Sequence, residues 1–111
     1  MIQYIELGGA NRPLKFSYYG LKAVCKKLKL KLTDLHRLSD SLENVGVLTY
    51  FALKSGAKSE GLSEDFKLAN VEDWLDAAGI SAIAQVLELF AESQAPKQDV
   101  AEEVEAETEG K

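Results

Sequence analysis

The feature that most constrains the fold is a long apolar stripe with the spacing of an α-helix. Its members recur every three or four residues: Leu35, Leu38, Leu42, Val45, Thr49 and Ala52. Because this spacing places side chains on one helical face, it predicts a single helix from Thr33, the N-cap, to about residue 54 or 55. Gly46 lies inside this helix at a cost of about 1 kcal/mol relative to alanine. Gly56 is predicted to end it.

Three shorter segments have the same periodicity. They predict helices over residues 18–29, 71–78 and 81–93, the first two capped by Ser17 and Asn70. In the first, Cys25 lies on the apolar stripe and is expected to fill the core. In the second, Trp74 and Leu75 are expected to point inward. In the last helix, Ile83, Leu87 and Phe90 form one apolar stripe. A second apolar row, Ala82, Val86 and Leu89, lies beside it.

The N-terminal segment predicts a β-hairpin. Residues 2–7 alternate in a segment rich in strand formers, residues 8–13 form a turn cluster, and residues 14–16 form a short return strand. Two strands alone are marginally stable in water, so the hairpin must pack on the helices. The predicted fold class is α+β and predominantly helical, with a hairpin followed by about four helices.

The length of 111 residues fits one domain. We expect residues 1–95 to form it and residues 96–111 to form an acidic tail. Residues 97–111 contain six acidic residues and no aromatic residue. Such a composition buries too little apolar surface to offset the entropy of ordering, so the tail is predicted to be disordered.

Charge is segregated along the chain. The net charge is -5, but residues 1–32 have +6 and residues 60–111 have -11. This polarity allows the two ends to attract each other, or copies to associate head to tail; plain solvated faces are the alternative.

The single cysteine excludes an intramolecular disulfide, and no segment has the length of a membrane helix or the pattern of a signal peptide. A cytoplasmic protein without membrane contact is the expectation.

The residues that could support catalysis are sparse. His36 and Cys25 are the only histidine and cysteine, which excludes a cluster of soft metal ligands within one chain. Glu72, Asp73 and Asp76 share one helix, and no pattern marks a cleft that would make two of them a catalytic pair. We therefore expect no enzyme activity, no metal and no cofactor, and His36 is expected on the surface. A small enzyme that uses the carboxylates is the weakest hypothesis.

Nucleic-acid binding is also not expected. The run from Lys22 to Lys31 lacks interleaved aromatic residues, and the whole chain is acidic. The acidic tail suggests one alternative function, an acidic inhibitor or regulator of a nucleic-acid-binding enzyme.

The remaining signal is a surplus of apolar positions around residues 47–53 and in the last helix, which exceeds one stripe. Either these helices form the centre of the domain, or they expose an apolar groove for a partner or another copy.

The order of elements resembles the tail assembly chaperones of long-tailed bacteriophages over about residues 2–94. The segments that carry the likeness are Leu14-Lys15-Phe16, Leu32-Thr33-Asp34-Leu35, Leu53-Lys54-Ser55-Gly56-Ala57 and Asn70-Val71-Glu72-Asp73-Trp74-Leu75-Asp76. The resemblance implies a protein of the bacterial cytoplasm, absent from the mature virion, that binds the tape measure protein and keeps it soluble while the tail tube assembles. It also implies recruitment of the tail tube protein by a longer, frameshifted form.

The resemblance gives the apolar surplus a use. A groove on the second and fourth helices would cover helical segments of the client, as in helix-in-groove recognition. The contact candidates are Tyr50, Phe51, Leu87 and Phe90, which are equally consistent with core positions.

Overall fold

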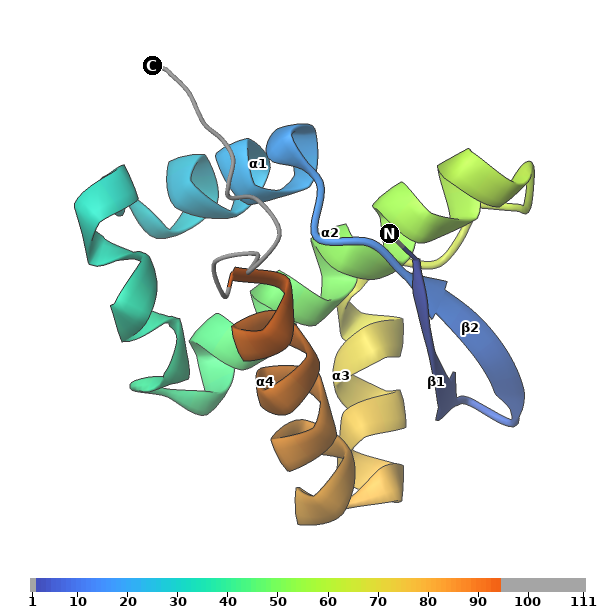
Figure 1. The fold of residues 1–111 in the computed structure, drawn as a ribbon. Coiled ribbons are helices and arrows are strands. Elements are labelled where there is room, and N and C mark those ends of the chain that lie inside the picture. Colours follow the sequence, from blue (N-terminus) through green and yellow to red (C-terminus); the bar gives the residue numbers. More distant parts are fainter. Residues whose placement is uncertain (1, 95–111) are drawn as a thin grey trace.

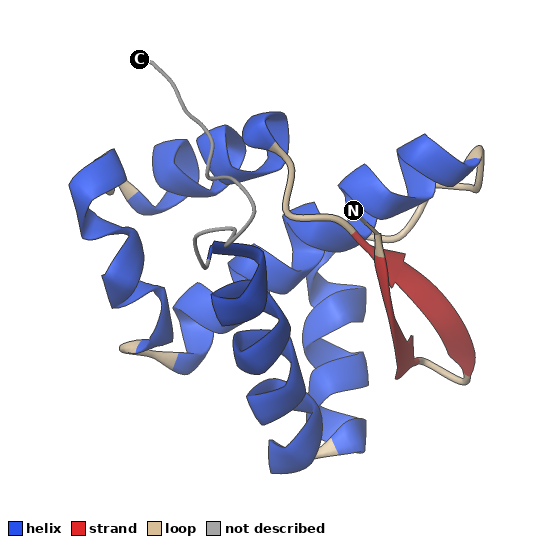
Figure 2. Ribbon diagram, in the orientation of Figure 1, coloured by secondary structure: helices blue, strands red, loops and turns tan. Residues whose placement is uncertain are grey.

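A computed structural model describes residues 2–94, which form a hairpin followed by helices (Figures 1 and 2). The elements are β1 (Gln3–Leu7), β2 (Ala10–Leu14), α1 (Tyr18–Leu28), the 3-10 helix η1 (Leu32–Ser39), α2 (Leu42–Glu60), α3 (Leu68–Ala78) and α4 (Ile80–Gln94). The predicted α+β, predominantly helical fold class is confirmed. The predicted acidic tail, residues 96–111, lies outside the described residues.

Helix α2 lies at the centre of the fold (Figure 1). Strand β2 and helices α1, η1, α3 and α4 all pack against it. Its buried residues therefore lie on several sides of the helix: Val45, Gly46, Val47, Leu48, Thr49, Ala52, Leu53, Gly56 and Ala57. The one polar side chain among them, Thr49, donates its hydroxyl to the Val45 carbonyl at 2.7 Å, so its burial leaves the donor satisfied. The apolar excess around residues 47–53 is mainly that of a central helix.

The hairpin turns more tightly than the sequence predicts. Gly8 and Gly9 both have positive φ, 62° and 77°, as a two-residue type I′ turn requires. Leu7 consequently pairs with Ala10, and β2 covers residues 10–14. The predicted bounds of the return strand, residues 14–16, were wrong, because two residues complete the turn that six were expected to form.

The hairpin contacts α2 at one closely packed point. The amide of Lys15 donates to the Ala52 carbonyl at 3.0 Å, and a Cβ at Gly56 would collide with the carbonyl of Pro13. Gly56 therefore allows close approach of two backbones, and the prediction that it ends the helix was wrong. Helix α2 continues to Glu60 and is capped by Gly61.

The predicted long helix over residues 33–55 is two helices. Ser41 accepts a hydrogen bond from the Asn44 amide at 3.2 Å, and Asn44 Nδ2 donates to the Arg37 carbonyl at 3.1 Å. Serine and asparagine favour such caps over helix interiors. The break interrupts the apolar stripe at Leu42, which is 68% exposed, whereas Leu38 before it and Val45 after it are 1% and 2% exposed.

Helix α1 begins where predicted. Ser17 Oγ accepts from the Gly20 amide at 3.0 Å and caps α1. However, α1 buries Gly20 and Val24, which leaves Cys25 at the edge of the interface and only partly buried. The expectation that Cys25 fills the core was therefore wrong.

Helices α3 and α4 form a bent pair. Helix α3 begins at Leu68 with Lys67 as its N-cap residue, so the prediction of Asn70 as the N-cap was wrong. Asn70 lies in the first turn, where its side chain accepts from the Lys67 amide at 2.8 Å. In α4, Ala82 and Val86 are buried. The predicted stripe of Ile83, Leu87 and Phe90 is only partly buried and packs on the edge of the core.

We predict that Gly56→Ala lowers the free energy of unfolding by about 1–3 kcal/mol, because the added methyl group collides with a backbone carbonyl that cannot rotate away. Urea unfolding of the purified protein measures it. Gly46→Ala in the same helix is the matched control, since its Cβ would meet only the Glu72 side chain, at an ordinary 3.7 Å from Cγ and 3.8 Å from Oε2. It should stabilise the protein by about 0.5–1 kcal/mol. Equal effects of the two substitutions would contradict the close approach at Gly56.

Candidate partner-binding groove

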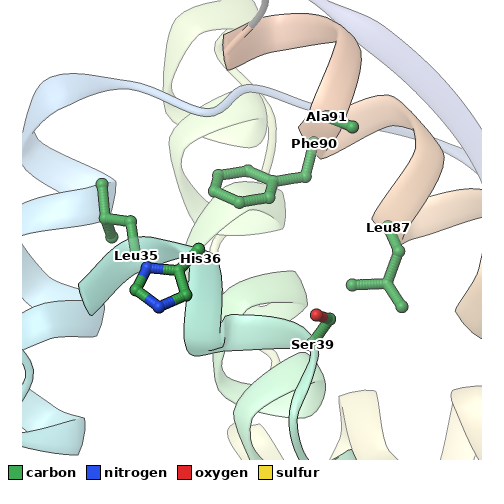
Figure 3. Close-up of a pocket in the computed structure, with 6 residues that line it drawn as sticks. All are labelled: Leu35, His36, Ser39, Leu87, Phe90 and Ala91. Carbon is green, nitrogen blue, oxygen red and sulfur yellow. The ribbon is translucent and has the colours of Figure 1, made fainter. Parts of the chain in front are cut away.

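An apolar groove lies between η1 and α4 (Figure 3). It has a volume of about 450 Å³ and is lined by Leu35, His36 and Ser39 of η1 and by Leu87, Phe90 and Ala91 of α4. Both helices pack against α2. We call this site the η1–α4 groove. Its η1 side comes from the N-terminal half of the predicted second helix, whereas the apolar excess in the sequence pointed to the C-terminal half.

Two of the four predicted contact residues line this groove. In Figure 3 the ring of Phe90 extends from α4 toward η1, and Leu87 lies one turn earlier, facing Ser39. Both side chains are partly buried and pack on the core. The Phe16 ring meets the Phe90 ring edge to face, with centroids 5.3 Å apart. Phe16 therefore restricts the Phe90 ring, so this contact helps to fix one wall of the groove.

The polar groups of the groove lie on η1. His36 is exposed, as predicted, and its Nδ1 lies 3.1 Å from the Thr33 carbonyl oxygen. Ser39 is also exposed. The groove thus has apolar side chains on its α4 wall and two groups capable of hydrogen bonding on its η1 wall. A partner with apolar side chains and polar flanks fits this chemistry.

The other two predicted contact residues belong to a different cluster. Tyr50 and Phe51 form an edge-to-face pair with centroids 4.9 Å apart, and Tyr50 contacts Phe66 at 6.2 Å. Neither residue lines the η1–α4 groove. The four candidates therefore do not form one surface, because α2 turns Tyr50 toward the loop before α3.

This aromatic cluster holds the hairpin and the α2–α3 loop against α3. Phe66 packs on Trp74 with centroids 5.6 Å apart, and the Arg12 guanidinium lies 3.8 Å from the Trp74 ring centroid. Arg12 Nε also donates to the Leu7 carbonyl at 2.6 Å. Trp74 is partly buried, and one edge of its indole packs closely against Gly8 in the turn. Phe66 was not predicted as a member of any cluster, and its one signal in the sequence is that it is an aromatic residue in a polar loop.

A second groove lies where α2, α3 and α4 meet. It has a volume of about 510 Å³, and we call it the acidic groove. Its carboxylates are Glu43, Glu72 and Asp76, and its remaining lining is Leu42, Val45, Gly46, Leu75 and Ile83. The sequence marked no cleft near these carboxylates. Among residues 2–94, no three His, Cys, Asp or Glu side chains are grouped so that they could hold a metal ion.

Comparisons with protein-family models, with curated proteins and with solved structures gave no match to this chain. Within the described part, no single helix is long and apolar enough to cross a membrane. Helices α3 and α4 together have that length and composition, and they are bent by 115° at their junction.

We predict that Phe16 and Phe90 are energetically coupled by about 1 kcal/mol, because their rings form an edge-to-face pair. A double-mutant cycle with Phe16→Leu and Phe90→Leu, followed by urea unfolding, measures this coupling. The control cycle pairs Phe16→Leu with Phe66→Leu, since Phe66 contacts Tyr50 and Trp74 instead. Coupling in the control cycle should stay within about 0.5 kcal/mol of zero.

Proposed function

We propose that this protein is a tail assembly chaperone that binds helical segments of a tape measure protein in the η1–α4 groove. The observation that carries the proposal is the groove itself, an apolar site of about 450 Å³ between two helices. The order of elements that resembles this chaperone family supports the choice of client. An extended form of the chain would recruit the tail tube protein.

The groove suits a helix as ligand. Leu87 and Phe90 are three residues apart on α4, and in Figure 3 the Phe90 ring extends toward η1 while Leu87 faces Ser39. An amphipathic helix inserts side chains spaced by three or four residues into such a site. Because Phe90 is already held by Phe16, binding orders few side chains and costs little conformational entropy.

Weak binding at each site is sufficient for this function. A tape measure protein is long and helix-prone, and it offers many segments to many copies of the chaperone. Each copy covers apolar surface on one segment, and the combined occupancy keeps the client soluble. A client that must later be released to the tube is better served by weak, repeated contacts than by one tight site.

The test is co-expression with the tape measure protein encoded near this gene. We expect the wild-type chain to raise the soluble fraction of the client and to co-purify with it. Leu87→Lys should weaken binding about tenfold, because a charge in the groove removes apolar contact with the client. The matched control is Leu62→Lys, which puts the same charge on a side chain that is 53% exposed and lies outside the groove.

The same assay separates the two predicted contact pairs. Tyr50→Leu should leave binding unchanged, because Tyr50 packs in the aromatic cluster. Circular dichroism of each variant verifies folding. A client that stays insoluble and unbound with the folded wild-type chain would overturn the proposed function. Equal loss of binding in the Leu87 and Leu62 variants would overturn the assignment of the groove.

A further inference from the structure

A dense group of exposed lysines lies on α1 and just beyond its C-terminal end. Residues 18–31 contain no acidic residue. Within residues 2–94 the one ion pair joins Arg37 and Asp40, so no lysine of this group is paired with a carboxylate in the described part of the chain. We call the group the lysine surface, and its members are Lys22, Lys26, Lys27, Lys29 and Lys31.

The lysine surface favours an anionic occupant with some apolar side chains. Lys22 and Lys26 are one helical turn apart, and like charges at this spacing destabilise a helix. A negatively charged segment along α1 would relieve this repulsion. Beside the lysines, Tyr18, Leu21 and Cys25 line a shallow, largely apolar site of about 290 Å³. Carboxylates alone would leave this apolar area uncovered.

The segment with the complementary chemistry belongs to the same chain. Residues 97–111 contain six acidic residues against two lysines, and their larger apolar residues are Val100 and Val104. This segment begins three residues after Gln94, the last residue that the structure describes. Its acidic residues are Asp99, Glu102, Glu103, Glu105, Glu107 and Glu109.

The end of α4 brings this segment close to the start of α1. The Phe90 ring, near the end of α4, lies 5.3 Å between centroids from Phe16, and Phe16 directly precedes the N-cap of α1, Ser17. In Figure 1, α4 runs toward α1. Residues 95–111 can span up to about 55 Å when extended, whereas α1, with 11 residues, is about 16 Å long. The segment therefore reaches the whole lysine surface.

We infer that residues 97–111 bind the lysine surface of their own chain. Because the segment approaches from the start of α1, Val100 and Val104 cover the apolar site that Tyr18 and Leu21 line. The acidic residues that follow approach the lysines toward the C-terminal end of α1. The occupant of the lysine surface is thus an anionic peptide that the protein itself supplies.

Weak contacts are sufficient, because the two partners are covalently joined. A single exposed ion pair contributes little, but a tethered segment has an effective concentration in the millimolar range. A dissociation constant of about 1 mM therefore keeps the segment bound for about half of the time or more. The lysine surface does not line the η1–α4 groove, so the inference goes beyond the proposed function and is tested without a client.

The experiment is paramagnetic relaxation enhancement in the full chain, with a nitroxide attached to Cys25. This residue is the only cysteine, is partly exposed and precedes Lys26 on α1. We expect the amide signals of residues 98–109 to lose about half of their intensity or more at low salt and to recover as salt screens the charges. The variant Lys22→Gln with Lys26→Gln should recover the same signals at low salt.

The matched control is Lys58→Gln with Lys67→Gln, which removes two exposed positive charges from α2 and from the N-cap of α3. It should leave the broadening unchanged, and circular dichroism verifies that each variant folds. A mixture of isotope-labelled chain without nitroxide and unlabelled chain with nitroxide reports contact between copies, and it should show no broadening. Three results would each overturn the inference: full intensity in the wild-type chain, broadening that neither salt nor the Lys22 and Lys26 variant reduces, or equal broadening in the mixture.

Discussion

The fold depends on the close approach of the hairpin to α2. Gly56 lets the Pro13 carbonyl lie directly on the helix backbone, and the Lys15 amide donates to the Ala52 carbonyl beside it. This contact buries the apolar side of the two-stranded sheet, which by itself would be only marginally stable in water. It also covers a side of α2 that would otherwise be exposed, so every other element is arranged around a helix that is buried on several sides.

The grooves are consequences of this central helix. Several elements pack on α2 from different directions. Two neighbouring elements contact each other only where they come close together. Between η1 and α4 they remain apart, and Leu35, Leu87 and Phe90 line the gap. At the junction of α2, α3 and α4 a second gap has carboxylates around it. A domain of this size has few layers, and its partly buried apolar residues are therefore available to partners.

Local chemistry predicted the parts of the fold that depend on a few neighbouring residues. The helical spacing after Ser17 gave α1 its start, and hydroxyl capping explains that accuracy. The same chemistry at Ser41 went unrecognised, because the apolar spacing of Leu35, Leu38 and Leu42 continued across the break. In the structure a 3-10 helix is followed by an α-helix with a different direction. The residues therefore have helical spacing in the sequence but do not share one helical face. Two of the four candidate contact residues, Leu87 and Phe90, line the groove. Their position follows from the apolar face of one helix, which the sequence shows. The position of Tyr50 and Phe51 depends on which element packs against each side of α2, which the sequence does not show.

The sequence by itself determined the fold class, the order of the elements, the hairpin and the segregation of charge, because periodicity, capping and turn residues act over short distances. Only the tertiary structure decided that Gly56 is a contact point, that η1 faces α4, and that α4 ends close to the start of α1. Those outcomes depend on contacts between residues far apart in the chain. A one-dimensional pattern specifies which face of a helix is apolar, but it does not specify which element covers that face.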